Sequence, residues 1–129
     1  MQTTLLFLAV LFGTLSTVSG AVFHIDPVNG SMAAPWSTLA EVFNDDLIET
    51  QSYAPLPFVD GVSQLVPKNP GAPVHAGDTL LLYDGLHGNV DQFGMYNTAY
   101  ITIMAAPGAV PILERFRLQG CARWRLVGV

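Results

Sequence analysis

The chain has 129 residues, half of them apolar, and a formal charge of −5 at pH 7. This acidic balance argues against a general nucleic-acid-binding protein, which would present a basic face, so we expect no nucleic-acid partner. Cys121 is the only cysteine, which excludes an internal disulfide and leaves the fold to be stabilised by packing.

The N-terminal segment has the pattern of an export signal. An apolar run at 5–12 is followed by small and polar residues at 13–20. The run is shorter than the roughly 20 apolar residues that span a bilayer. It has the length of a signal-peptide core, although no Lys or Arg precedes it. We therefore predict a signal peptide over 1–21 and a mature protein that is secreted, periplasmic or on the cell surface, with no stable membrane anchor after cleavage. An uncleaved anchor or a buried N-terminal strand is the alternative.

A strand and a short helix are predicted next. Apolar and polar residues alternate at 21–26, which suits a half-buried strand. The pattern at 35–43 predicts a short helix, with Ser37 or Thr38 as its N-cap and Glu41 placed to bond back. Its apolar face would consist of Trp36, Leu39, Val42 and Phe43. A small helix with one apolar face could close the open end of a stack of repeats.

The segment 44–75 shows no clear periodicity and holds five prolines. We predict a long irregular excursion here rather than a linker between domains. It keeps enough apolar side chains to pack over a neighbouring surface, namely Tyr53, Leu56, Phe58, Val59, Leu65 and Val66. Long loops with their own apolar anchors are commonly functional lids or covers.

Short strands separated by glycine-containing corners are predicted over 76–129. Leu81, Ile103 and Leu126 occupy equivalent places in three successive strands and are separated by 22 and 23 residues. A period in this range is typical of a solenoid, whose repeats bury their apolar faces against one another. We therefore predict an all-β fold: a right-handed parallel β-helix with an N-terminal cap helix and about two coils.

This single domain would span 22–129, with the strand and cap helix at 22–43, the excursion at 44–75 and the first coils at 76–129. Because the chain stops within its last predicted strand, we expect the stack to be incomplete at its C-terminal side, as in the beginning of a larger protein. The uncovered apolar edge at 124–129 would then be open to pairing with another chain. Self-association through this open coil is therefore expected.

Four stretches together carry a family pattern: His-Ile-Asp-Pro-Val-Asn-Gly-Ser at 24–31, Pro-Trp-Ser-Thr-Leu at 35–39, Ala-Gly-Asp-Thr-Leu at 76–80, and Tyr-Ile-Thr-Ile-Met-Ala-Ala-Pro-Gly at 100–108. They resemble the N-terminal part of secreted right-handed parallel β-helix proteins. That group includes pectate lyase-like proteins, chondroitinase B-like and alginate lyase-like polysaccharide lyases, and mannuronan epimerases. The resemblance covers nearly all of 22–129 outside 44–73.

The resemblance implies a protein that binds or processes an acidic polysaccharide, lyase- or epimerase-like in its full-length form. In that group the catalytic residues lie on later coils, which this chain lacks. No catalytic residue is therefore carried over, and the chain alone is expected to be inactive. A departure from the pattern, Gly-Leu-His-Gly at 85–88, makes His87 the most conspicuous polar residue of the first coil. The alternative is a non-catalytic structural or adhesive protein of the cell surface.

Proton abstraction beside a uronic-acid carboxylate needs a base and a group that neutralises the carboxylate. The candidates for catalysis are His87, Arg117 and Arg125, and the candidates for substrate binding are Tyr83, Asp84 and Trp124. If the coils stack, Asp84 and His87 at one corner and the two arginines on later strands would form a rim for a sugar groove. The alternative is that Asp84 belongs to a turn, His87 is a surface histidine, Trp124 packs the last coil and the arginines form the solvated face of strands.

Asp26 is the one candidate metal ligand. Together with Asn29 and backbone carbonyls, it offers the oxygen atoms that calcium prefers. The same Asp-Pro-Val-Asn-Gly stretch is typical of a turn, and no loop with alternating acids follows it. No cofactor is therefore evident in this chain, and calcium is left as an expectation for the full-length protein.

Overall fold

The computed structural model describes residues 20–30 and 36–129. The structure is mostly β, with 49% strand and 6% helix. Its elements are β1 (Val22–Ile25), α2 (Leu39–Asn44), β2 (Thr50–Ala54), β3 (Gln64–Lys68), β4 (Thr79–Leu82), β5 (Gly85–Leu86), β6 (Asn89–Phe93), β7 (Tyr96–Ala105), β8 (Pro111–Ile112), β9 (Arg115–Gln119) and β10 (Ala122–Val127). Within the described ranges, no helix has the length and apolar character needed to cross a membrane. The predicted signal peptide, 1–21, lies almost entirely outside those ranges.

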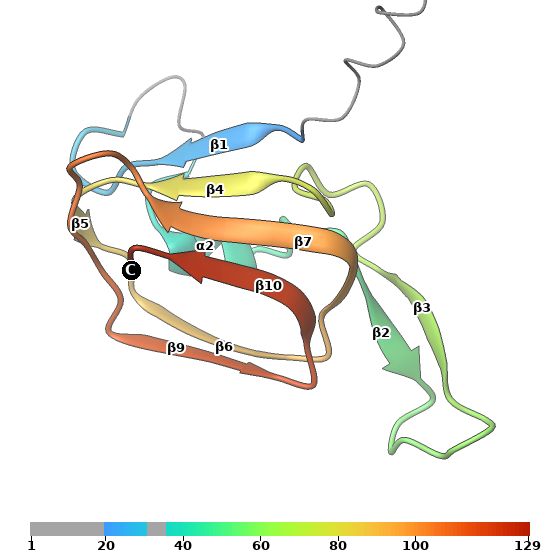
Figure 1. Cartoon of the computed structure of the whole chain (residues 1–129). Helices are drawn as coiled ribbons and strands as arrows, with labels where there is room; N and C mark the ends of the chain where they lie inside the picture. Colours follow the sequence, from blue (N-terminus) through green and yellow to red (C-terminus); the bar gives the residue numbers. More distant parts are fainter. Residues whose placement is uncertain (1–19, 31–35) are drawn as a thin grey trace, which may run out of the picture.

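One six-stranded sheet runs through the molecule, with the strand order β1-β4-β7-β2-β3 and with β10 paired to β7. Strands β1, β4, β7 and β10 are parallel and lie side by side (Figure 1). Two short parallel pairs, β5–β8 and β6–β9, form separate sheets. The large sheet is curled, and the whole arrangement is a half-barrel.

Strands β2 and β3 form an antiparallel hairpin that projects from the body of the molecule (Figure 1). β2 also pairs antiparallel with the beginning of β7, where Gln51 lies opposite Tyr96. β4 pairs only with the second half of β7, from Thr102 onwards. The first half of β7 therefore leaves an edge to which β2 can add, and this attachment sets the position of the hairpin.

The predicted right-handed parallel β-helix is wrong as a fold class, because the main sheet is mixed and the molecule is a curled half-barrel. The segment 44–75 contributes a hairpin that brings antiparallel strands into that sheet. In addition, β1 is followed by helix α2 and not by further strands of a coil. This first part of the chain therefore adds β1 to the large sheet but no strand to the β5–β8 or β6–β9 pair. A regular solenoid needs equivalent repeats, and these two features remove that equivalence.

The pairing of neighbouring segments agrees with only part of the predicted spacing. Ile103 lies opposite Leu126, as the spacing predicts, but its partner on β4 is Leu80 instead of Leu81. Leu80 and Ile103 are fully buried, whereas Leu126 is 43% exposed. Because paired residues point to the same face of a sheet, they form one apolar row that runs from the interior to an open end at β10.

Helix α2 lies beside the sheet and buries one face, consisting of Leu39, Val42 and Phe43. Its N-cap is Thr38, whose hydroxyl accepts a hydrogen bond from the backbone N–H of Glu41 at 3.2 Å. The Glu41 carboxylate in turn accepts from the backbone N–H of Ser37 at 2.9 Å. Of the two predicted N-caps, Thr38 is therefore confirmed, as are Leu39, Val42 and Phe43 of the predicted apolar face. Trp36, the fourth predicted member of that face, lies before the helix and forms an isolated bridge with Ile25. The helix packs against β6 and fills the interior that the half-barrel leaves open.

Candidate functional site

His87 lies inside the molecule, where its side chain is fully buried. Its Nδ1 accepts a hydrogen bond from the backbone N–H of Leu39 at 3.2 Å, and its Nε2 donates to the carbonyl of Tyr83 at 2.8 Å. The His87 carbonyl accepts from the N–H of Ala40 at 3.0 Å. The first N–H groups of a helix have no partner within the helix. His87 supplies the acceptors for two of these N–H groups of α2, those of Leu39 and Ala40, and so ties the helix to the chain that follows β4.

These bonds define one neutral form of the His87 ring. Because Nδ1 faces an N–H donor, it must carry a lone pair, and the proton resides on Nε2. Burial lowers the pKa of His87, against the opposing effects of the Tyr83 carbonyl and the negative charge of Asp26. The ring is therefore neutral at pH 7, and it has no free nitrogen with which to take a proton from a substrate.

Tyr83 and Asp84 follow β4 at a corner of the chain. The Tyr83 hydroxyl lies 2.7 Å from Nδ1 of His24, which places both side chains in one polar contact. Asp84 is exposed, and its Oδ1 accepts from the backbone N–H of Val110 at 2.6 Å. Asp84 therefore links two corners that are far apart in the sequence, as a turn residue would.

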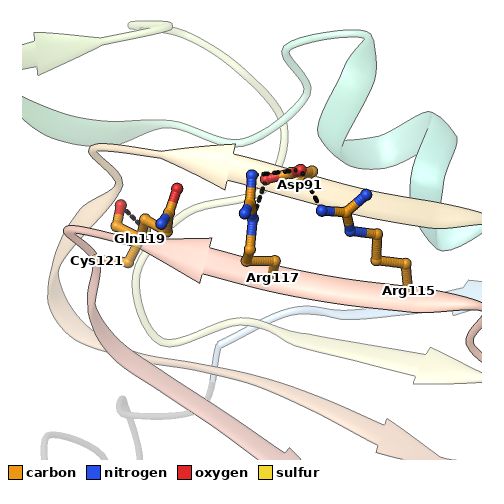
Figure 2. Close-up of polar contacts among 5 residues, drawn as sticks. All are labelled: Asp91, Arg115, Arg117, Gln119 and Cys121. Atoms are coloured by element: carbon orange, nitrogen blue, oxygen red, sulfur yellow. Dashed lines mark hydrogen bonds and ion pairs between the residues drawn. The ribbon is translucent and has the colours of Figure 1, made fainter.

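The arginines of β9 meet a carboxylate on the neighbouring strand β6 (Figure 2). Arg117 donates from Nε and Nη2 to the two carboxylate oxygens of Asp91, at 2.8 Å and 2.9 Å. Arg115 lies 3.5 Å from the same carboxylate. The hydrogen bond from Arg117 lowers the pKa of Asp91, and the same bond raises the pKa of Arg117. Beyond this cluster, the thiol of Cys121 donates to the carbonyl of Gln119 at 3.2 Å (Figure 2).

The two candidates on β10 have different surroundings. The Trp124 ring lies 5.3 Å from the Phe43 ring, and its Nε1 donates to the carbonyl of Met95 at 3.1 Å. Trp124 therefore packs against helix α2. Arg125 is exposed, and its guanidinium lies 4.7 Å from the centre of the Tyr100 ring.

The carboxylate of Asp26 is used by a turn. Its Oδ1 accepts from the backbone N–H groups of Val28 and Asn29 at 3.0 Å and 2.9 Å, and its Oδ2 accepts from the Asn29 side chain at 3.1 Å. The backbone N–H of Asn29 makes the largest contribution to lowering the pKa of Asp26. Across residues 20–30 and 36–129, no three His, Cys, Asp or Glu side chains lie close enough together to hold a metal ion.

The six candidates for catalysis and substrate binding do not converge on one place. Only His87 and Tyr83 are joined by a hydrogen bond, and that bond uses the Tyr83 backbone. The others have separate partners, which are Val110 for Asp84, Asp91 for Arg117, Tyr100 for Arg125, and Met95 with Phe43 for Trp124. A groove with different residues lies beside the hairpin.

This aromatic groove has a volume of about 250 Å³ and is lined by Ser52, Tyr53, Leu56, Phe58, Phe93, Gly94 and Tyr96. Tyr53 stands between two other rings, with centres 5.1 Å from Phe58 and 5.0 Å from Tyr96, both edge to face. Phe58 and Phe93 are 55% and 57% exposed. Large aromatic side chains left this open, next to one another, are typical of a binding surface.

The hairpin loop that carries Leu56 and Phe58 is held by Ser63. The Ser63 hydroxyl donates to the carbonyl of Pro55 at 2.8 Å and accepts from the N–H of Val59 at 2.9 Å. Ser63 is buried, so these bonds are shielded from water. The groove wall is therefore ordered before any ligand arrives, which lowers the entropy lost on binding.

A cation of the hairpin contacts one residue of the groove lining. The half-buried Lys68 donates from its ammonium to the backbone carbonyl of Phe93 at 3.2 Å. Gly94, with φ +69°, lets the chain pass close to the hairpin, because a Cβ there would lie 3.1 Å from the Ser52 hydroxyl. The groove thus combines apolar rings, a few hydroxyl groups and one positive charge.

No protein family, curated protein or solved structure in the comparisons matches this chain. The resemblance to polysaccharide lyases and epimerases therefore stays a prediction from sequence.

The sequence interpretation missed this groove, although part of its signal was present. The apolar residues kept within 44–75, among them Tyr53 and Phe58, predicted a surface that packs over a neighbour. Their partners Phe93 and Tyr96 flank Gly94 more than thirty residues later in the chain. Only the pairing of β2 with β7 brings the two groups together.

Proposed function

We propose that this protein is an exported carbohydrate-binding protein that holds an acidic polysaccharide in the aromatic groove without chemically changing it. One observation carries the proposal: four aromatic rings line an open groove, and the Lys68 ammonium is hydrogen-bonded to the backbone carbonyl of Phe93, one of the lining residues. Aromatic rings pack against the apolar faces of sugar rings, while hydroxyl groups and charges fix their orientation. A lysine beside the groove favours a sugar that carries a carboxylate.

Binding is favoured over catalysis because of the state of the candidate catalytic groups. His87 is buried with both ring nitrogens in hydrogen bonds, and Arg117 is paired with Asp91. Neither lines the groove. Export is proposed from the apolar segment at 5–12 and the small residues that follow it.

The test is a titration of the full chain with an oligosaccharide of uronic acids prepared from alginate. Phe58→Ala and Phe93→Ala each remove one exposed ring, so we expect each to weaken binding at least about tenfold. Tyr100→Ala is the matched control, because Tyr100 is also about half exposed, at 49%, but does not line the groove. This control should bind within about twofold of the wild type.

Lys68→Gln tests the charge. It should weaken binding of the uronic-acid oligosaccharide and reduce its dependence on salt, because one charge contact is lost. Equal affinity of the wild type and both phenylalanine variants would overturn the groove as the binding site. Release of unsaturated or epimerised uronic acids by the wild type would overturn the non-catalytic part of the proposal.

A second proposal concerns self-association, and one observation favours it. Within the described chain, β10 pairs only with β7 and leaves its other edge without a strand partner. Leu126 and Val127 on this strand are each 43% exposed. An open strand edge with apolar side chains invites pairing with a second chain, although the charges of Arg123 and Arg125 oppose two such strands meeting. Sedimentation velocity should detect a dimer that Leu126→Lys abolishes, and a monomer at all concentrations would contradict it.

A further inference from the structure

A second hollow, which we call the polar pocket, adjoins the aromatic groove. It has a volume of about 210 Å³ and is lined by residues 49–51, 75–76 and 96–98. Tyr96 lines both hollows, and β2 passes from the pocket at 49–51 to the groove at 52–53. The two hollows are therefore neighbours, but their linings differ in chemistry.

Two buried oxygen atoms of the pocket lining have no hydrogen-bond partner among residues 20–30 and 36–129. They are Oγ1 of Thr50 and Oδ1 of Asn97, on side chains that are only 5% and 3% exposed. Thr50 directly precedes Gln51 on β2 and Asn97 directly follows Tyr96 on β7, so both flank the one pair through which these antiparallel strands join. Buried polar atoms are nearly always paired, so two neighbouring exceptions in one pocket wall call for a donor from outside the chain.

The orientation of the Asn97 side chain is fixed by its other end. Its Nδ2 donates to the carbonyls of Ala122 and Arg123, both at 3.3 Å, and the Arg123 guanidinium donates to the Asn97 carbonyl at 3.0 Å. These bonds fill the place where the register between β7 and β10 shifts. Since both amide hydrogens point to carbonyls, Oδ1 is the free end. The hydroxyl of Thr50 can turn among three staggered positions to meet a ligand.

The pocket offers acceptors and a negative charge. Besides Thr50 and Asn97, its lining includes Glu49, whose Oε2 accepts from the N–H of Gly71, and Gln51, His75 and Thr98, whose side chains also carry polar groups. The Lys68 ammonium is hydrogen-bonded to the carbonyl of Phe93, which lines the aromatic groove and not the polar pocket. A ligand that pairs the two free oxygens must bring hydrogen-bond donors, and the negative charge of Glu49 disfavours a carboxylate beside it.

We infer that the polar pocket binds the hydroxyl groups of one neutral sugar residue next to the aromatic groove. This inference deepens the proposed function and rests on it for the nature of the ligand. A sugar ring offers several hydroxyl donors at once, which suits neighbouring acceptors on two strands, and one face of the ring can lie on Tyr96. The protein would thus select a polysaccharide that places a charged sugar residue in the aromatic groove and a neutral one in the polar pocket.

The experiment follows the amide resonances of Thr50 and Asn97 by NMR while the full chain is titrated with D-glucose or with D-glucuronate. The two sugars differ in the charge at one carbon. We expect glucose to shift both resonances and glucuronate to leave them unchanged. Glu49→Gln keeps an acceptor for Gly71 but removes the charge, so it should admit glucuronate.

Thr50→Val removes the free hydroxyl at nearly constant volume and should weaken glucose binding roughly fivefold. Its melting temperature should stay equal or rise, because an unpaired buried hydroxyl is lost. Thr102→Val is the matched control, since Thr102 lies on β7 but outside the pocket, and it should leave glucose binding unchanged.

The outcomes separate this inference from the proposed function. Glucose that shifts neither resonance, with a lower melting temperature for Thr50→Val, would mean that a resident water pairs the two oxygens, and it would overturn the inference. If the uronic-acid oligosaccharide still binds in that case, the proposed function stands alone. Glucose shifts that persist in Phe58→Ala and Phe93→Ala support the pocket as a separate subsite. Shifts that disappear in those variants would overturn it.

Discussion

The junction around His87 and the side of the molecule around the hairpin use their side chains in opposite ways. At the junction a conspicuous polar residue is buried, and all its polar atoms are paired, with helix α2, with Tyr83 and with the carbonyl of Ile112. Beside the hairpin, Phe58 and Phe93 remain more than half exposed. Paired and buried groups hold a fold together, whereas open apolar groups are available to a ligand. The junction therefore stabilises the fold, whereas the hairpin side leaves its rings open to the ligand that we propose.

The largest effect should come from His87→Ala. It leaves the N–H of Leu39 and the carbonyl of Tyr83 without partners inside the protein and removes buried volume. We expect a loss of about 3 kcal/mol in the free energy of unfolding, measured by urea denaturation. Phe93→Ala, on the hairpin side, should cost less than about 1 kcal/mol because its ring is largely exposed.

Equal losses in the free energy of unfolding for His87→Ala and Phe93→Ala would contradict the different roles of the two regions. His75→Ala serves as a second reference, because the His75 side chain is 55% exposed and should likewise cost under about 1 kcal/mol. A His87→Ala variant that keeps wild-type stability would show that the helix contact is dispensable.

The pH dependence of stability sharpens the same contrast. Burial lowers the pKa of His87 in the folded state, so the unfolded chain, with a pKa of about 6.5, binds the proton more tightly. The stabilising contribution is therefore complete above about pH 6.5 and is lost as the pH falls toward the folded-state pKa. The loss has a slope of at most about 1.4 kcal/mol per pH unit.

His87→Gln carries no titrating ring at this position. We expect urea denaturation between about pH 7.5 and pH 5 to show a shallower slope for this variant than for the wild type. The absolute stability of the variant does not enter the comparison, because only the two slopes are compared. Identical slopes would contradict a buried, neutral His87.

The sequence predicts helix α2 well because its signals are local. Thr38 and Glu41 lie within one turn of each other, and the apolar face follows from the helical period. The fold class depends on contacts across long distances in the chain. The hairpin within 44–75 joins the sheet through the pairing of Gln51 with Tyr96. No periodicity in the sequence predicts this pairing. The expectation of equivalent coils was wrong for this reason.

The candidate site was harder to predict than the fold. His87 is conspicuous in the sequence because it departs from the family pattern at 85–88, yet burial rather than residue type decides whether a ring can act. The groove residues look ordinary in sequence, since tyrosine and phenylalanine occur in every core. Their exposure follows from where the hairpin stands, and this depends on the edge of β7 that β4 leaves free.

A smaller effect is expected at the helix cap. Thr38→Ala removes the oxygen that accepts from the N–H of Glu41, at 3.2 Å, and should destabilise the protein by about 1 kcal/mol. Ser37→Ala is the control, because Ser37 contributes only its backbone N–H to the Glu41 carboxylate. Thermal or urea unfolding should show this variant within about 0.5 kcal/mol of the wild type. A larger loss of stability for Ser37→Ala than for Thr38→Ala would contradict the assignment of Thr38 as the N-cap.

The smallest effect belongs to the exposed cluster on β6 and β9. The hydrogen bond from Arg117 lowers the pKa of Asp91, so this contact stabilises the folded state above the unfolded-state pKa of about 4 and is lost as the pH falls through the folded value. Asp91→Asn should therefore be less stable than the wild type at neutral pH, by an amount that shrinks on acidification below about pH 4. Added salt should shrink the same difference, because the three side chains face solvent. A stability difference between Asp91→Asn and the wild type that persists at low pH and in high salt would contradict this prediction. It would mean that Asp91 stabilises the fold through packing, as His87 does, and not through its charge.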